Sequence, residues 1–393
     1  MKNNYKLLVF RRSLSGFFNN LYSQYIYLYI VMLGINVAYL GLFRSIASLL
    51  SSFISSSLGF ISDIFGRKKA YIIGLLLEIL SIVFFAFAFN WTFCLLGLAL
   101  SITSFFGLKS VENILIAEST SRESRAFGFG LISSLSITAS IFSPLIAAYI
   151  INMCGGISTQ GIRPLFYIGL IGLVFTTVVI ILFLSETYSS GESIKYTVLD
   201  AFRMVKEKKW LQKWILVETL GGYVFDLSMP FTTIYMVEIK HADEFIIGYT
   251  GTALNIASIL FSPIIGKLGD KYGRVKTLAF FRIFFYISVM IFLFAPSPQY
   301  LILYGFFRGI FFASSPVFQT ITMELVSRNF RGRWEGIKSL IKLIARSPAS
   351  FIGGYLYYYF SPETPFITAV LVDMFIRLPL IFSMPETLYK SVK

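Results

Sequence analysis

Long apolar segments separated by short polar ones run along almost the whole chain. Two of them, 81–107 and 127–161, contain no charged residue. Each is longer than the roughly 20 residues that an α-helix needs to cross about 30 Å of hydrocarbon. Placing one helix on each apolar run predicts twelve spans, at 14–36, 38–62, 69–89, 91–116, 126–151, 164–185, 212–237, 245–268, 275–295, 298–324, 333–358 and 364–384.

The composition agrees with an all-α integral membrane protein. Of the 393 residues, 56% are hydrophobic and only 14% are charged, and the mean hydropathy is +0.74. A soluble domain of this length would need far more polar surface. The composition therefore predicts that the chain lies in a lipid bilayer.

The formal net charge of +14 raises the possibility of a nucleic-acid partner, so the distribution of the charge matters. Basic residues gather before the first predicted helix, after the second and in the central connection: Lys2, Lys6, Arg11, Arg12, Arg67, Lys68, Lys69, Lys195, Arg203, Lys206, Lys208 and Lys209. This asymmetry follows the positive-inside rule, which predicts a cell inner or plasma membrane protein with both termini in the cytoplasm. The charge orients the chain and requires no nucleic acid. We expect the basic, apolar N-terminus to be retained as the first helix, since it has no small-residue cleavage site.

An internal repeat relates the two halves of the chain. The segment 59–69, GFISDIFGRKK, recurs as 266–276, GKLGDKYGRVK, at an offset of 207 residues. Glu118 and Arg125 recur as Glu324 and Arg331, and Glu186 recurs as Glu386. The order of these marks predicts a duplicated unit of six helices, at 1–187 and 210–393, joined by a cytoplasmic linker at 188–209.

The G-x-x-x-D-x-x-G-R-K-K element resembles the signature between helices two and three of the major facilitator superfamily. The echo in the second half is a feature of that family, and the resemblance covers essentially the whole chain. It departs from the family at Ile64, where an arginine is common. The resemblance implies a secondary transporter that works by alternating access, with helices 1, 4, 7 and 10 lining a cavity.

These loop residues also have a direct physical interpretation. Glycine permits close helix approach and tight turns, aspartate can cap a helix, and arginine can bind a carboxylate bidentately. The E-x6-R spacing and the P-E-T element at 385–387 are similar to those of sugar porters of the superfamily, and this resemblance implies a network that closes the cytoplasmic gate in the outward-facing state. The residues assigned to this gate are Gly59, Asp63, Gly66, Arg67, Lys69, Glu118, Arg125, Glu186, Gly266, Asp270, Gly273, Arg274, Glu324, Arg331 and Glu386.

Several charged residues fall inside the predicted spans, where each costs roughly 2.5–3.5 kcal/mol on insertion scales. Asp373 and Arg377 are four residues apart and should pair. Glu78 and Arg282 lie on outer helices, where a structural role is favoured. The other charged residues supply candidates for the site: Lys109, Arg308, Lys342 and Arg346 for substrate binding, and Asp226 and Glu112 for proton coupling. The first helix adds uncharged candidates for substrate binding, which are Asn19, Asn20, Gln24 and Tyr25.

The basic residues of this set outnumber the acidic ones, which predicts an electropositive cavity and a small organic anion as substrate. Asp226 is the first candidate for a proton-coupling carboxylate, and Glu112 the second. The spacing of small residues in 126–151 favours an alternative, a drug:proton antiporter with a broad substrate range. A sugar porter or a transporter fold used as a nutrient sensor fits less well.

An enzyme is not expected. The chain contains no G-x-x-x-x-G-K-S/T nucleotide loop, and its single histidine, His241, forms no metal cluster. We therefore expect no cofactor or metal, transport driven by an ion or solute gradient, and a monomer.

Overall fold

A computed structural model describes residues 2–120, 125–187, 208–325 and 331–387. Within these ranges, it describes the side chains of all residues except 2–3, 55–65, 117, 125–130, 133, 323, 331–337 and 339. Every regular element in the described ranges is helical. The chain divides into unit 1, Met1–Glu192 with Asp243–Thr252, and unit 2, Ser193–Ala242 with Ala253–Lys393.

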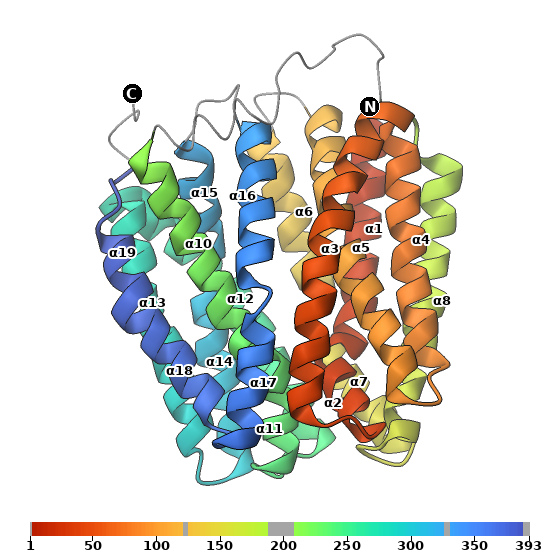
Figure 1. Cartoon of the computed structure of the whole chain (residues 1–393). Helices are drawn as coiled ribbons and strands as arrows, with labels where there is room; N and C mark the ends of the chain where they lie inside the picture. The colour runs from red at the N-terminus through yellow and green to blue at the C-terminus, as the bar shows by residue number, and fades with distance from the viewer. Residues whose placement is uncertain (1, 121–124, 188–207, 326–330, 388–393) are drawn as a thin grey trace. The chain divides into compact units, whose positions relative to one another are not determined.

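Unit 1 contains six membrane passes (Figure 1). The first is broken by a short 3-10 turn and comprises α1 (Lys2–Tyr22), η1 (Ser23–Tyr25) and α2 (Ile26–Met32). The others are α3 (Val37–Phe65), α4 (Arg67–Ala86), α5 (Trp91–Ser119), α6 with α7 (Arg125–Ala139, Ser143–Met153) and α8 (Thr159–Phe183).

Unit 2 contains the other six passes, although the first residues of α12 group with unit 1. Its passes are α10, η2 and α11 (Lys209–Ser228, Met229–Phe231, Thr232–Glu238); α12 (Glu244–Tyr272); α13 (Arg274–Phe294); η3, α14 and α15 (Pro298–Tyr300, Leu301–Phe312, Ser315–Glu324); α16 and α17 (Arg331–Arg346, Ala349–Tyr359); and α18, η5 and α19 (Thr364–Val372, Asp373–Arg377, Leu378–Phe382). The fold is therefore the expected all-α membrane architecture of twelve passes.

Short polar residues set the starts of several helices. The side chains of Asn36, Asn90 and Ser158 accept hydrogen bonds from backbone N–H groups in the first turns of α3, α5 and α8. These groups have no partner within the helix, so the caps stabilise each helix start. Asparagine and serine thus mark the points where the chain re-enters the membrane.

Nine helical segments among the described residues are long and apolar enough to cross a membrane by length and hydropathy alone. The passes α1–α2, α10–α11 and α16–α17 are not among them. Each of these three carries ionisable residues, such as Arg11, Glu218 and Lys342. A hydropathy criterion thus fails to detect the three passes in which charges are concentrated.

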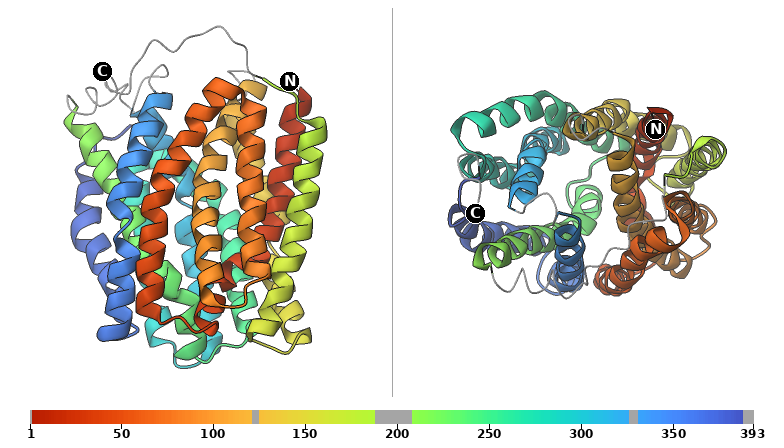
Figure 2. Two further views of the ribbon diagram at one scale, coloured as in Figure 1. Left: turned by 45° about the vertical axis from the view of Figure 1, so that its right-hand side comes forward. Right: turned by 90° about the horizontal axis from the view of Figure 1, so that it is seen from above.

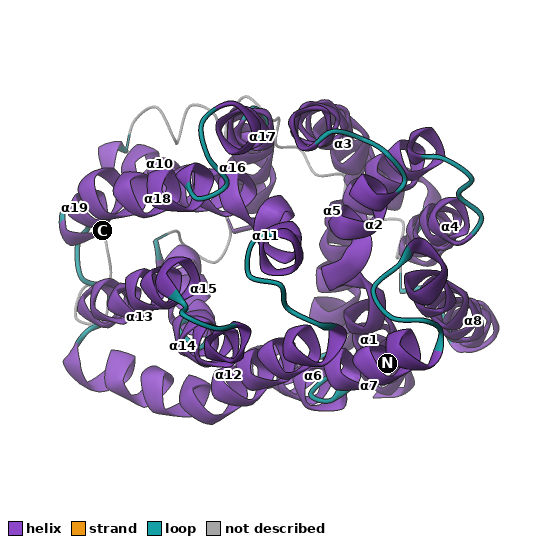
Figure 3. Ribbon diagram, turned by 90° about the horizontal axis from the view of Figure 1, so that it is seen from below, coloured by secondary structure: helices purple, strands orange, loops and turns teal. Residues whose placement is uncertain are grey.

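Apolar side chains pack the interior of each unit and cover its outer surface. Unit 1 has a core around Leu8, Tyr71 and Leu115, and unit 2 has one around Trp214, Phe281 and Ile321. Figure 2 shows the passes of unit 1 running side by side, and Figure 3 shows α16 and α17 beside α10 in unit 2. Large apolar side chains such as Phe183, Phe280 and Phe375 remain exposed, as lipid-facing residues should.

Candidate functional site

The loop between α3 and α4 forms a compact polar site in unit 1. Gly66 has φ +101°, a conformation that glycine adopts without steric strain. The Glu186 carboxylate accepts hydrogen bonds from the backbone N–H groups of Arg67 at 2.9 Å and Lys68 at 3.1 Å. The Arg67 side chain contacts Glu118 at 3.4 Å. Glu186 thus caps the positive N-terminal end of α4, and Arg67 ties this end to α5.

Unit 2 repeats the arrangement between α12 and α13. Gly273 has φ +105°. Glu386 accepts hydrogen bonds from the N–H groups of Arg274 at 2.8 Å and Val275 at 3.2 Å. The Arg274 side chain pairs with Glu324, and also with Asp270 at 3.1 Å. We call these two arrangements the loop latches: Gly66, Arg67, Glu118 and Glu186 in unit 1, and Asp270, Gly273, Arg274, Glu324 and Glu386 in unit 2.

Not every residue assigned to the gate joins a loop latch. Lys69 is exposed and takes no part in these hydrogen bonds. Among the described residues, a Cβ atom added at Gly266 would meet nothing within 4 Å, so this part of the structure shows no close helix approach at Gly266. The side chains of Gly59, Asp63, Arg125 and Arg331 lie outside the described residues.

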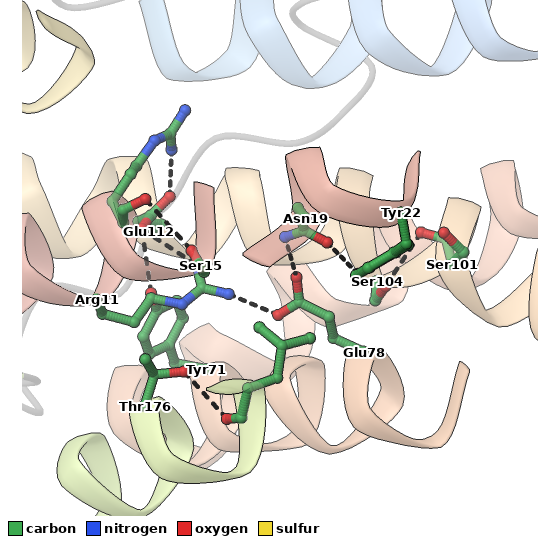
Figure 4. Close-up of polar contacts among 12 residues, drawn as sticks. Arg11, Ser15, Asn19, Tyr22, Tyr71, Glu78, Ser101, Ser104, Glu112 and Thr176 are labelled. Atoms are coloured by element: carbon green, nitrogen blue, oxygen red, sulfur yellow. Dashed lines mark hydrogen bonds and ion pairs between the residues drawn. The ribbon is translucent and has the colours of Figure 1, made fainter. Parts of the chain in front are cut away.

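A buried group of charged side chains, the unit 1 ionic cluster, links α1 to α4 and α5 (Figure 4). It consists of Arg11, Arg12, Glu78 and Glu112. Arg11 contacts Glu78 at 2.6 Å and Glu112 at 3.4 Å, and Arg12 pairs with Glu112. The Tyr71 hydroxyl donates to Glu112 at 3.1 Å. The four charges balance, which offsets the cost of placing them in the membrane.

The polar contacts of this cluster continue along α1. The Asn19 amide donates to Glu78 at 3.2 Å, and Tyr22 donates to Asn19. The predicted binding residue Asn19 is therefore held by protein groups. Asn20 is half-buried, and Tyr25 is completely enclosed. Gln24 lies beside Gly251, whose added Cβ would come within 3.0 Å of the Gln24 side-chain oxygen.

Two members of the unit 1 ionic cluster, Arg11 and Arg12, were not predicted to lie inside the membrane. Arg11 and Arg12 were predicted to precede the first helix and orient the chain, but α1 begins at Lys2 and includes both. Arg11, Ser15, Asn19 and Tyr22 recur every three or four residues, which is the signal of one helix face that could have revealed them.

Lys109, a substrate-binding candidate, and Glu112, a proton-coupling candidate, are three residues apart on α5 but lie in different surroundings. Glu112 is 2% exposed within the cluster, whereas Lys109 is exposed and lies over the Phe105 ring at 5.9 Å. Side chains three residues apart on a helix point about 60° away from each other around the helix axis. One of them can therefore be buried in a packed face while the other lies at its exposed edge.

In unit 2, the lysine cluster comprises Glu218 on α10 with Lys338 and Lys342 on α16. Lys338 lies 3.0 Å and Lys342 3.3 Å from the Glu218 carboxylate. The same carboxylate accepts hydrogen bonds from the Thr322 hydroxyl at 2.9 Å and the Trp214 indole at 3.2 Å. Glu218, which the sequence analysis did not assign to a site, thus organises three passes of unit 2.

About one turn beyond Lys342 on α16, Arg346 pairs with Asp226 of α10. Gly222 lies against this side chain, since an added Cβ would approach Arg346 Cδ within 3.0 Å. Ser350 also donates to the Asp226 backbone carbonyl at 3.0 Å. The absence of a side chain at Gly222 therefore lets the guanidinium group lie close to α10.

A third group, the arginine cluster, comprises Arg282, Asp373 and Arg377. Asp373 contacts Arg282 at 2.5 Å and Arg377 at 3.1 Å, and accepts a hydrogen bond from Tyr286 at 3.0 Å. The predicted pair between Asp373 and Arg377 is confirmed. Asp373 lies where the helix widens into the π-helical turn η5, and Gly221 leaves room for the Arg377 guanidinium.

The ion pairs reduce the number of free positive charges on which the expectation of an anionic substrate rested. Arg346 is paired with Asp226, and Lys342 shares the carboxylate of Glu218 with Lys338. Arg308 was expected to face the cavity; it is 8% exposed and packs over Phe285, Phe311 and Phe312. The sequence count failed because it could not tell which charges are paired. Among the described residues, no group of three or more His, Cys, Asp or Glu side chains is arranged to hold a metal ion.

Comparisons with known proteins identify relatives along the whole chain. The family model described as Major Facilitator Superfamily matches residues 9–221 and 214–385. The chain is 24% identical over 310 residues to multidrug resistance protein MdtG of Serratia proteamaculans, covering 75% of this chain and 71% of that protein. It is 26% identical over 295 residues to the multi-drug resistance efflux pump PmrA homolog of Lactococcus lactis, covering 72% and 70%.

Solved structures share the fold at low sequence identity. A POT family transporter in complex with 5-aminolevulinic acid matches with a TM-score of 0.76 and 14% identity, covering 98% of this chain and 96% of that one. The nucleoside transporter NupG matches with a TM-score of 0.72 and 15% identity, covering 97% and 98%. At these identities the structural likeness concerns the fold alone.

Proposed function

Because the chain belongs to the major facilitator superfamily, we propose that this membrane transporter exports amphiphilic organic compounds in exchange for protons. The similarity to proteins named as multidrug resistance efflux pumps supports this proposal. The ion pairing of Lys342 and Arg346 favours it over a carrier built around free cations for a small anion. No nucleotide loop is present in the sequence, so an ion gradient supplies the energy.

The observation that carries the coupling proposal is a buried acid paired with a more accessible arginine in each unit. Asp226 has a side chain 3% exposed and its partner Arg346 is 14% exposed; Glu112 is 2% exposed and Arg12 is 31% exposed. A proton that reaches the carboxylate from the more accessible side, where the arginine lies, neutralises the acid and so breaks the ion pair. The arginine is then free to make another contact. We assign proton coupling to Asp226 first and to Glu112 second.

The loop latches have a separate proposed role. We assign them to closing the cytoplasmic gate in the outward-facing state, because each fixes a helix start to two other passes of its unit. In Glu186→Gln and Glu386→Gln, the first amides of α4 and α13 should exchange hydrogen faster, as measured by mass spectrometry. Unchanged exchange would contradict the role of Glu186 and Glu386 as caps.

The organisation of the whole chain follows from the same proposal. We assign 1–187 and 210–393 to two duplicated halves, with 188–209 as a cytoplasmic linker and both termini in the cytoplasm of a monomeric protein. The basic residues near the N-terminus and in the linker support this orientation. Neither a nucleic-acid partner nor a catalytic role is proposed.

Transport assays in inverted membrane vesicles test the proposed function. Respiration acidifies the vesicle interior, and accumulation of Hoechst 33342 or ethidium is followed by fluorescence. We expect accumulation that collapses with nigericin, is lost in Asp226→Asn and persists in Lys213→Gln, a matched change at an exposed residue of the same helix.

Two outcomes would contradict the proposal. Vesicles containing the protein that accumulate neither dye above the background of empty vesicles would argue against export of such compounds. Full proton-driven accumulation in Asp226→Asn would exclude Asp226 as the coupling acid and move the assignment to Glu112, tested by Glu112→Gln.

A further inference from the structure

Arg308 occupies an aromatic enclosure inside unit 2. It lies on α14 and is 8% exposed. Its guanidinium carbon lies 4.6 Å from the ring centroid of Phe285 on α13, 5.3 Å from Phe312 and 5.7 Å from Phe311. Three rings therefore frame one buried cation.

The hydrogen-bonding groups of Arg308 are unused among the described residues. Arg282, also buried, gives two hydrogen bonds to Asp373, whereas Arg308 donates none to a described side chain or carbonyl. The Nε atom of Arg282 is fully buried and has no hydrogen-bond partner. No nitrogen of Arg308 is fully buried in this way. The Arg308 N–H groups are therefore not sealed completely, although nine-tenths of the residue is covered.

The surrounding charges leave this part of unit 2 with an excess of positive charge. Asp373 acts on Arg308 electrostatically, but its carboxylate already binds Arg282 and Arg377. Among the described residues, Arg308 therefore has no carboxylate of its own. Cation–π contacts stabilise a guanidinium group but satisfy none of its five donors. A buried charge in a membrane protein with idle donors is a candidate ligand site.

From this geometry we propose that Arg308 binds the acidic group of an aromatic carboxylate-type ligand. The guanidinium N–H groups hold the two carboxylate oxygens, and Phe285, Phe311 and Phe312 contact the ligand's apolar part. The binding step needs only unit 2. Its extension to transport rests on the proposed export function, where it would add acidic aromatic compounds to the substrates.

Thermal stabilisation of the purified full-length protein by benzoate tests this site. Benzamide has the same ring without the charge, and acetate and chloride carry a charge without the ring. We expect benzoate alone to stabilise the protein. Affinity for benzoate should fall at least about tenfold in Arg308→Gln, as expected for a charge-assisted hydrogen-bond pair. The affinity should fall less in Arg308→Lys, which keeps the positive charge. This variant also tests the site if Arg308→Gln fails to fold. The affinity should not change in Lys276→Gln, which alters an exposed cation on α13.

Three results would overturn the inference: no stabilisation by benzoate, equal stabilisation by benzamide or by acetate and chloride, or unchanged benzoate affinity in both Arg308 variants. Ethidium accumulation in vesicles separates this inference from the export proposal. Loss of benzoate binding with normal ethidium transport in Arg308→Gln would support both. Arg308-dependent benzoate binding by a protein that transports no dye would retain the site and reject the export function.

Discussion

The two units hold their buried charges with opposite sign on equivalent passes. The 3-10 breaks at Ser23–Tyr25 and Met229–Phe231 lie 206 residues apart, and at this offset Arg12 of unit 1 corresponds to Glu218 of unit 2. Arg12 pairs with an acid on α5, whereas Glu218 pairs with lysines on α16. The first pass of each unit thus carries the central charge, but the partner comes from a different helix.

The serine and lysine positions complete this comparison. Lys342 and Arg346 of α16 correspond at the same offset to Ser136 of α6 and to Ser140, which directly follows α6. Ser136 donates to the backbone carbonyl of Arg12 at 3.1 Å. Unit 1 therefore uses the equivalent face for neutral packing. Each loop latch, by contrast, combines a positive-φ glycine, an arginine and two glutamates. The lesson is that the cytoplasmic loops of the repeat preserve their chemistry, while the membrane interior has diverged.

Removing the central acid of each unit should give the largest effects. Glu112→Gln and Glu218→Gln each leave buried cations without a full partner, which should cost about 3–5 kcal/mol of stability at neutral pH. A buried lysine can lose its proton as the pH rises, and an arginine cannot. The loss in Glu218→Gln should therefore shrink as the pH rises above neutral, and that in Glu112→Gln should persist. Thermal unfolding relative to the unchanged protein at each pH measures this.

Second-site changes provide the control. Glu112→Gln with Arg12→Gln should recover part of the loss, because the uncompensated cation is gone and Arg11 keeps Glu78 at 2.6 Å. An equal pH dependence in both acid variants, or no recovery in the double variant, would contradict the difference between the units.

The next largest effect should be the same in both units. Gly66→Ala and Gly273→Ala force an L-residue into a positive-φ conformation, which costs on the order of 1–3 kcal/mol. An added Cβ would also approach the carboxylates of Glu186 and Glu386 to 2.6 Å and 2.5 Å. Thermal unfolding of the two variants should show similar losses. A loss confined to one unit would show that the loop latches are not equivalent.

A smaller effect is expected where a second partner remains. In Lys342→Gln, Glu218 keeps Lys338 at 3.0 Å together with Thr322, so the loss should be about 1 kcal/mol, near the net value of a typical hydrogen bond. Lys338→Gln is the matched comparison. Because its side chain is 5% exposed and that of Lys342 is 23% exposed, Lys338→Gln should be the more destabilising. The reverse order in thermal unfolding would contradict this assignment.

The smallest effects should come from the acids that pair with the latch arginines. Glu118 and Glu324 are about one-third exposed, and ion pairs of this kind contribute about 0–1 kcal/mol. Glu118→Gln and Glu324→Gln should lower stability within this range, and by less at high salt because the charges are screened. A loss as large as that of Glu112→Gln would show that the latch acids are effectively buried.

Periodicity and local motifs were sufficient to predict much of this protein from the sequence. Runs of apolar residues predicted the twelve passes, because the hydrocarbon thickness imposes a minimum length on each helix. The repeated loop motifs predicted which latch residues would meet, such as Arg274 and Glu324. The resemblance made this possible, since the spacing alone names no partner.

The charge pairing in the membrane could not be predicted in the same way. A rule that assigns terminal basic residues to a loop placed Arg11 and Arg12 outside the membrane, but α1 continues through both. Arg11 and Glu112 are 101 residues apart, and no local pattern connects them. The sequence by itself determined the helices and the loop motifs, because hydrophobic length and glycine geometry are local properties. Only the tertiary structure decided which buried charges neutralise each other and that Arg308 keeps its donors unused, because desolvation and pairing depend on side chains brought together by packing.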